Sequence, residues 1–119
     1  MRENITSGSK WEPLLGYSRA VKVGSYIHVA GTTGPGADAA EQTRAALETI
    51  RKVLEANGSK LSDVVRTRLF VTDISQWEAI GRVHGEYFGE IRPAMAMVQV
   101  VKLIDPALFV EIEADAYIG

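Results

Sequence analysis

The sequence predicts an α+β fold with the element order β-β-α-β-α-β-β, in which two helices cover one face of a sheet. Three observations predict it: a hairpin pattern near the N-terminus, two capped segments with helical spacing, and a last segment that alternates between apolar and acidic residues. The ranges expected for the strands are 18–23, 26–30, 64–71, 94–101 and 109–117.

The first two strands are expected to form a hairpin. Residues 18–23 and 26–30 are rich in apolar and β-branched side chains, which favour strands. Gly24-Ser25 lies between them and suits a two-residue type II′ turn. The residues 32–36 that follow, Thr-Thr-Gly-Pro-Gly, are expected to form a loop.

The first helix, 39–56, is bounded by signals at both ends. Asp38 can cap its N-terminus with Glu41 as the capping-box partner, and Asn57-Gly58 supplies the stop. Helical spacing places four apolar residues along one stripe, namely Leu47, Ile50, Val53 and Leu54.

The middle strand, 64–71, leads into the second helix. The strand is expected to divide its side chains between two faces, with Val65, Thr67, Leu69 and Val71 on one and Arg66, Arg68 and Phe70 on the other. A second capping box, Ser75-x-x-Glu78, opens the helix, and Gly89 ends it. One side of this helix is expected to carry Trp77, Ile80, His84 and Tyr87.

The last strand, 109–117, has two chemically different faces. Side-chain alternation groups Val110, Ile112, Ala114 and Ala116 on one face, and Glu111, Glu113 and Asp115 on the other. If the arginines of the middle strand share the acidic face, that face is mixed, with aromatic groups interrupting it. Such a face is either exposed to water or an assembly surface, and we favour assembly because exposed aromatic groups usually need cover.

Composition excludes several classes of protein. The 119 residues are expected to form a single domain, 1–119, and 46% of them are hydrophobic, enough for a packed core. A formal net charge of −2 argues against nucleic-acid binding by phosphate neutralisation, and no apolar run is long enough to span a membrane. The sequence contains no cysteine and no cluster of metal-ligand residues, so we expect no metal and no cofactor. Residues 1–13 lack a signal-peptide core, so a cytoplasmic location is the default expectation.

Three segments together carry a family resemblance. The segment RPAMAMVQVVKLIDPALFVEIEADA resembles the C-terminal signature of the RidA/YjgF family, the reactive intermediate deaminases. YIHVAGTTG and LEANGSKLSDVVRTRLFVTDISQW resemble the second strand and the helix-loop-strand centre of that family, so the resemblance extends from about residue 15 to 117. It implies a fold like that of the small chorismate mutases: a mixed sheet with two helices packed on one face. It also implies a homotrimer with small-molecule pockets between subunits.

The resemblance assigns roles to three residues. Active members hydrolyse imino or enamino acids to keto acids and ammonia, and Glu111 matches the glutamate that positions the water. Tyr17 matches the pocket tyrosine, and Gly31 matches a backbone position beside the ligand. Each has a structural alternative: Glu111 as a salt-bridged carboxylate, Tyr17 as an interface aromatic, and Gly31 as a strand-end glycine.

Met95 is the main departure from the family pattern. The deaminases have an arginine at this position, after Pro-Ala, which clamps the substrate carboxylate. A thioether carries no charge and donates no hydrogen bond, so substrate binding should differ. Arg19 or Arg92 is a candidate replacement cation, and His84 a candidate acid-base group, although each is also explained as a solvated arginine or a packed histidine.

Two functions therefore stay open at this stage. The first is a RidA-family hydrolase of the imine or enamine deaminase type, with an altered substrate range and poor activity on the 2-imino acids generated from serine or threonine. The second is a non-catalytic homotrimer that binds a small molecule in the cleft between subunits. Retention of Glu111, Tyr17 and Gly31 favours the hydrolase, whereas Met95 and Met97 favour the binding protein.

Overall fold

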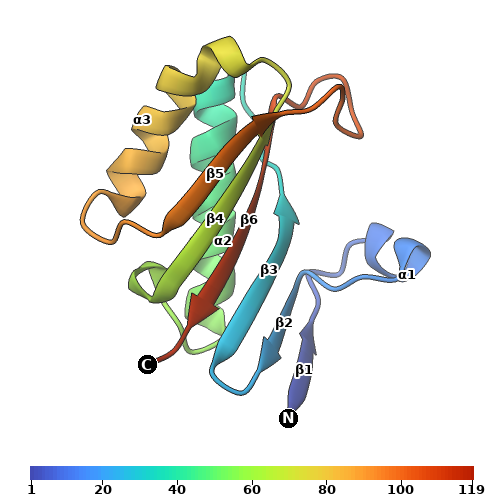
Figure 1. Ribbon diagram of the computed structural model, residues 1–119. Helices are drawn as coiled ribbons and strands as arrows, with labels where there is room; N and C mark the ends of the chain where they lie inside the picture. Colours follow the sequence, from blue (N-terminus) through green and yellow to red (C-terminus); the bar gives the residue numbers. More distant parts are fainter.

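A computed structural model describes residues 1–119 and contains one six-stranded mixed sheet with two long helices on one face (Figure 1). The strands are β1 (Arg2–Ile5), β2 (Ala20–Val23), β3 (Tyr26–Thr32), β4 (Val64–Val71), β5 (Ala94–Gln99) and β6 (Val110–Tyr117). The helices are α1 (Trp11–Leu15), α2 (Ala39–Ala56) and α3 (Trp77–Phe88), and two 3-10 turns span Leu61–Asp63 and Ile74–Gln76. The α+β class and the helices on one face are confirmed.

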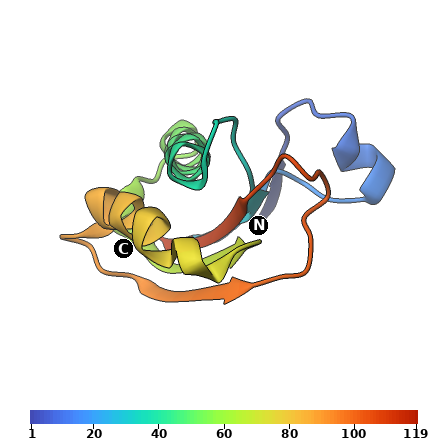
Figure 2. The same cartoon turned by 90° about the horizontal axis from the view of Figure 1, so that it is seen from above.

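The sheet order is β1-β2-β3-β6-β4-β5, and only the β4–β5 pair is parallel. Seen along the sheet, α2 and α3 form a layer above it, and the opposite face has no helical cover (Figure 2). This arrangement leaves one sheet face buried and one open, which is why the last strand needs two kinds of side chain.

The core lies between the sheet and these two helices. It contains 18 buried hydrophobic residues, and every second residue of β6 from Val110 to Ala116 belongs to it. The intervening acidic residues of β6 are half-buried on the open face, as the alternation predicts. α2 has the predicted bounds, and the Asp38 carboxylate accepts a hydrogen bond from Glu41 N at 2.8 Å, as predicted.

The β2–β3 hairpin has the predicted two-residue turn. Val23 pairs with Tyr26, and Gly24 has a φ of 57°, a conformation that glycine adopts without strain. β3 continues two residues beyond the predicted end, and its pairing with β6 shifts between Val29 and Thr32. This bulge matters for the site because it contains Gly31.

Two elements near the N-terminus were not anticipated. β1 adds four exposed or half-exposed residues to the edge of β2, and α1 is a single five-residue turn of helix. Neither is long enough to show a clear period of 2 or 3.6 in the sequence. Figure 1 shows α1 standing away from the sheet, beyond β2.

Two details of the middle of the chain differ from the prediction. The pairing of β4 with β6 shifts between Val64 and Arg66, so Val64 is buried and Val65 is 49% exposed instead of facing the core. The predicted Ser75 cap is wrong, because the Asp73 carboxylate accepts the hydrogen bond from Ser75 N and caps the 3-10 turn before α3. Trp77 consequently begins α3 in an exposed position.

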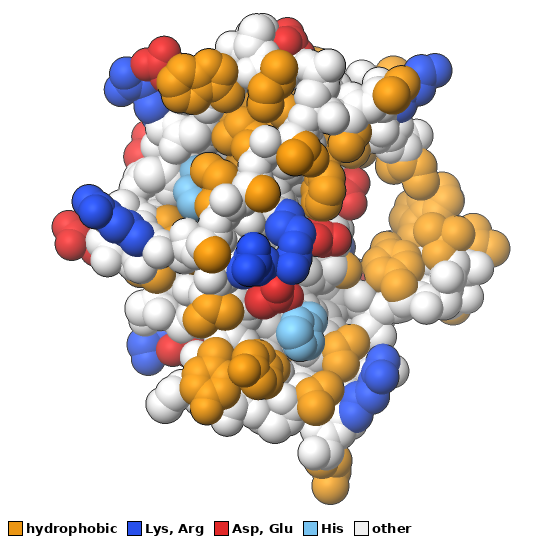
Figure 3. All heavy atoms as spheres, in the orientation of Figure 1, with side chains coloured by type: hydrophobic (Ala, Val, Ile, Leu, Met, Phe, Trp, Pro, Cys, Tyr) orange, Lys and Arg blue, Asp and Glu red, His pale blue; other side chains and the backbone are white.

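The open face carries a charged cluster among hydrophobic side chains (Figure 3). Arg68 pairs with Asp115 at 3.1 Å and with Glu113 at 3.7 Å, and His28 Nδ1 lies 2.9 Å from Asp115. These contacts confirm that the arginines and carboxylates share a face. No helix of the chain is long and apolar enough to cross a bilayer.

Candidate functional site

One cavity brings together four of the six predicted site residues. It has a volume of about 760 Å³ and contains Tyr17, Arg19, Gly31 and Glu111. Tyr17 and Arg19 come from the segment between α1 and β2, Gly31 from the β3 bulge and Glu111 from the start of β6. The remaining lining residues are Ser9, Trp11, Leu15, Ala30, Thr33, Ile104, Asp105 and Leu108.

Gly31 and Glu111 are in direct contact within this cavity. A Cβ atom at Gly31 would lie 2.9 Å from Glu111 Cδ and still closer to Oε2, inside van der Waals contact. The missing side chain of Gly31 therefore provides the space that the Glu111 carboxylate occupies. The β3 bulge places this glycine opposite β6. The position of the Glu111 carboxylate therefore depends both on the backbone bulge and on the absence of a side chain at residue 31.

The Glu111 carboxyl is half-buried and forms no ion pair, because its partner across β4 is Phe70, whereas Arg68 pairs with the other two carboxylates of β6. Burial raises the pKa of Glu111, the nearby charge of Glu113 raises it further, and the Arg19 cation opposes both effects. A carboxylate with a raised pKa is a better proton acceptor than an ordinary one. The salt-bridge alternative for Glu111 therefore fails, and the group is chemically available.

Arg19 is tied to the bulge beside Glu111. Its Nη2 donates to Gly31 O at 2.6 Å, and its own carbonyl accepts from Ala30 N at 3.0 Å. Its Nε is buried without a hydrogen-bond partner. The arginine is thus a partly buried cation in the cavity, and the interpretation of Arg19 as a freely solvated side chain does not hold.

Tyr17 is positioned by a glutamate that the sequence analysis missed. Gly16 ends α1 with a φ of 76°, and the Glu12 carbonyl accepts hydrogen bonds from Gly16 N at 2.9 Å and Tyr17 N at 3.0 Å. The Glu12 side chain, 5% exposed, accepts from Thr6 Oγ1 at 2.8 Å and from Ser7 N at 3.1 Å. The Ser7 hydroxyl also donates to this carboxylate, and the hydrogen bonds from the Ser7 and Thr6 hydroxyls lower the pKa of Glu12. The carboxylate therefore holds α1 against the segment before it.

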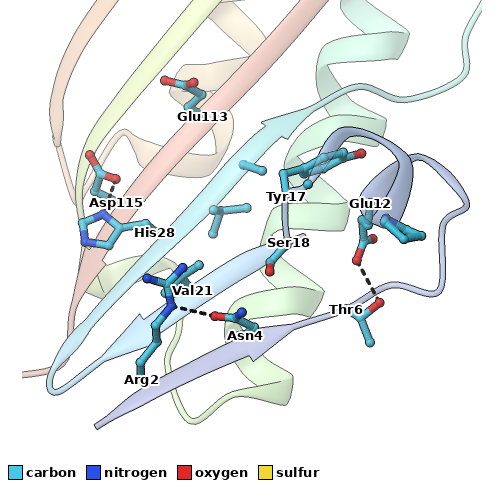
Figure 4. A pocket seen from close by; sticks show the side chains of 14 residues that line it. Arg2, Asn4, Thr6, Glu12, Tyr17, Ser18, Val21, His28, Glu113 and Asp115 are labelled. Atoms are coloured by element: carbon cyan, nitrogen blue, oxygen red, sulfur yellow. Dashed lines mark hydrogen bonds and ion pairs between the residues drawn. The ribbon is translucent and has the colours of Figure 1, made fainter.

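Tyr17 also borders a second cavity, of about 810 Å³, on the open face (Figure 4). Figure 4 shows Glu12 and Thr6 on one side of this cavity, and His28 with Asp115 on the other. Tyr17 thus borders both cavities, and only the cavity of about 760 Å³ contains Glu111 and Gly31.

Met95 and His84 do not line the Glu111 cavity of their own chain. Met95 pairs with Thr67 and so faces the helix side of the edge strand β5, beside Trp77 and Met97 of a shallow groove, whereas Glu111 lies on the open side. His84 is buried, and its Nε2 lies 2.9 Å from the Thr67 hydroxyl. Burial lowers the pKa of His84.

Arg92, the second candidate cation, is exposed outside this cavity. It has a φ of 56°, rare for a non-glycine residue, and its Nε donates to Gly89 O at 3.1 Å. It therefore links the end of α3 to the start of β5.

The comparisons with known proteins agree with this architecture. Residues 8–118 match the family described as Endoribonuclease L-PSP. A RutC family protein of Pyrococcus horikoshii is 37% identical over 98% of both chains, and the 3-aminoacrylate deaminase RutC of Acinetobacter baylyi is 37% identical over 89% of this chain and 90% of its own. A crystal structure of a YjgF/YER057c/UK114 family member from Mycobacterium tuberculosis is 55% identical, with a TM-score of 0.97 over 99% of this chain and 100% of that one.

The fold and site thus define a small α+β protein with a carboxylate-bearing cavity beside a bulged strand. The chain belongs to the RidA/YjgF/L-PSP family, to which RutC also belongs.

Proposed function

We propose that this protein is a hydrolase that releases ammonia from small imines or enamines, with a substrate range different from that of the 2-imino acid deaminases. The observation that carries this proposal is the Glu111 carboxyl, held against Gly31 in a cavity and kept out of every ion pair. A relative that is 37% identical is named as a deaminase of 3-aminoacrylate, an enamine, which supports the same class of reaction.

The chemistry requires little from the protein beyond Glu111. The carboxylate takes a proton from a water molecule while the water oxygen forms a bond to the carbon of the C=N group. An enamine first becomes an imine by taking up a proton at carbon, and a protonated imine gives a neutral carbinolamine whose nitrogen takes up the proton that Glu111 held. The carbon–nitrogen bond then breaks and releases ammonia, while the hydroxyl oxygen forms the carbonyl double bond and its proton passes back to the Glu111 carboxylate. Tyr17 borders this space and can orient the substrate by packing against it.

The altered substrate range follows from Met95, where the family resemblance leads us to expect an arginine. Met95 and Glu111 lie on opposite faces of one sheet, so they can share a cleft only if Met95 comes from another copy. We propose a homotrimer with the ligand site between subunits for this reason. Met95 would then present an apolar, uncharged group to the substrate.

The alternative function is that of a non-catalytic trimer binding a small molecule in the same cleft. It is favoured by the apolar part of the cavity wall, which includes Trp11, Leu15, Ile104 and Leu108. Binding alone would require no water activation, so the two functions differ in what Glu111 does.

Ammonia release separates the two functions. Imines are generated in situ by an amino acid oxidase acting on several amino acids, serine and leucine included, and ammonia is measured with and without the protein. We expect ammonia to be released faster with wild-type protein than without it. The release catalysed by the protein should be slower for the imine from serine than for the imine from leucine. Glu111→Gln should lose activity by about 100-fold or more, the range of general base catalysis. The wild-type rate should rise with pH through an inflection above 4.5, because burial raises the pKa of Glu111.

The stability of Glu111→Gln provides the control. A carboxyl whose pKa is raised by folding contributes stability below its unfolded pKa, and this contribution is lost as the pH rises through the folded pKa. The neutral variant should therefore melt no lower than wild type at pH 7. Equal ammonia release by wild type and Glu111→Gln would contradict the hydrolase, and ligand binding without any catalysed release would support the binding protein.

A further inference from the structure

Arg19 is the only partly buried arginine of the chain without a carboxylate partner. Arg44, Arg51, Arg68 and Arg82 each have a carboxylate oxygen within 4.0 Å, and Arg19 has none. The three other arginines without such a partner, Arg2, Arg66 and Arg92, are exposed to solvent. Asp105 and Glu111 line the same cavity, and the Arg19 cation acts on Glu111 at longer range, but neither carboxylate forms an ion pair with Arg19. A partly buried cation is costly without a direct partner, so the contact at the guanidinium is left for the carboxylate of a ligand.

The guanidinium is also held in one orientation. The bond from Nη2 to Gly31 O fixes it beside the β3 bulge, while Nη1 has no acceptor in the protein and Nε is buried without a partner. A fixed arginine with an unused donor binds a planar carboxylate with little further loss of side-chain freedom. Glu111 does not take this place, because no ion pair joins it to Arg19.

Two segments supply the apolar part of the cavity wall, beside the polar residues Ser9, Thr33 and Asp105. α1 contributes Trp11 and Leu15, and the loop between β5 and β6 contributes Ile104 and Leu108. Figures 1 and 2 both show α1 and this loop on the same side of the molecule. Trp11, Leu15 and Ile104 are 44%, 62% and 75% exposed, an amount of exposed apolar surface that a bound ligand would cover.

We infer that Arg19 is the anion-binding residue of this cavity, and that it holds the carboxylate of a small ligand whose apolar body lies between α1 and the loop between β5 and β6. The inference rests on the proposed ligand site, but not on catalysis there. It places the charged contact immediately before β2, in the same chain as Glu111, instead of at position 95.

Calorimetric binding of two matched compounds tests the inference. The compounds are 4-methyl-2-oxopentanoate and its neutral amide, which differ only in the charged end group. Wild type should bind the carboxylate about 10- to 100-fold more tightly than the amide, the range for one hydrogen bond to a charged group. Arg19→Gln, which keeps a donor for Gly31 O, should lose that preference, and Arg19→Lys should keep part of it.

The control is Arg44→Gln, which removes an exposed arginine of α2 that pairs with Glu86. It should bind both compounds as wild type does. Equal binding of carboxylate and amide by wild type, or an unchanged preference in Arg19→Gln, would overturn the inference and leave the hydrolase proposal intact. If wild type neither binds these compounds nor releases ammonia from any imine, both proposals fail.

Discussion

Gly31 is the residue on which the position of Glu111 depends most. The Glu111 carboxylate occupies the volume that any side chain at position 31 would need, and the Gly31 carbonyl also orients Arg19. The clash involves the flexible end of a glutamate and not backbone. A larger residue would therefore displace the carboxylate without preventing folding.

Gly31→Ala should lower ammonia release by about 10-fold or more, because a displacement of only about 1 Å is costly to a reacting group. Its melting temperature should stay close to that of wild type. Gly85→Ala is the matched control, since nothing lies within 4 Å of a Cβ there and alanine favours helices. If Gly31→Ala were fully active, Glu111 would have to work from a different position.

At the scale of single elements, α3 and β4 are joined by a buried polar contact. The Thr67 hydroxyl and His84 Nε2 are both shielded from water, and the His84 ring packs on Phe88 with 4.7 Å between centroids. Burial keeps the imidazole neutral by lowering its pKa. The stability that depends on neutral His84 is present above its unfolded pKa of about 6.5 and is lost as the pH falls through the folded pKa.

Thr67→Val should therefore destabilise the protein by about 1–3 kcal/mol, because it leaves a buried imidazole without a partner. Chemical denaturation measures this change. Thr43→Val is the control: this threonine is equally buried, but its hydroxyl donates to Ala39 O, a carbonyl of the regular α2 helix. If Thr67→Val lowers the free energy of unfolding no more than Thr43→Val does, the contact between Thr67 and His84 contributes little to stability.

At the scale of the whole molecule, the sheet has an open face and an edge that one chain leaves uncovered. Tyr26, Val98 and Tyr117 are each more than 40% exposed there, around the Arg68–Asp115 cluster, and β5 ends the sheet. Aromatic and apolar groups in these amounts favour contact with further copies of the chain. This is a physical argument for assembly that is independent of family resemblance, whereas the number of copies in the proposed trimer rests on that resemblance.

Met95→Arg tests how assembly and chemistry are connected. Sedimentation should give a mass three times the 13.0 kDa of one chain, for both wild type and variant. The variant should then release ammonia from the imine of serine about 10-fold faster, since a guanidinium restores a charged contact to the cleft. A monomer in solution would contradict the shared cleft. A well-folded trimer without any gain would mean that the pocket has diverged beyond position 95.

Much of the fold could be predicted because its signals are local. The Asp38 cap, the stripe of α2 and the alternation along β6 each depend on residues within a few positions of one another. Val65 was assigned to the wrong face for the opposite reason. The bulge at its position arises from pairing with β6, which is distant in sequence.

The candidate site could be predicted only in part. Glu111, Gly31 and Tyr17 were found through family resemblance, but neither Glu12 nor the apolar wall of the cavity has a sequence signal of its own. Residues 11, 104 and 108 belong to a short helix and an irregular loop, where no periodicity marks them. Their common position depends on how α1 and the loop pack.

By itself, the sequence determined the strand and helix patterns, the two faces of β6 and the family, because these follow from short-range periodicity and ordered motifs. Only the tertiary structure decided that Arg19 is partly buried beside Glu111, that His84 belongs to the core, and that Met95 faces away from the carboxylate of its own chain. The physical reason is that burial and charge pairing depend on sheet register and a backbone bulge, which bring together residues far apart along the chain.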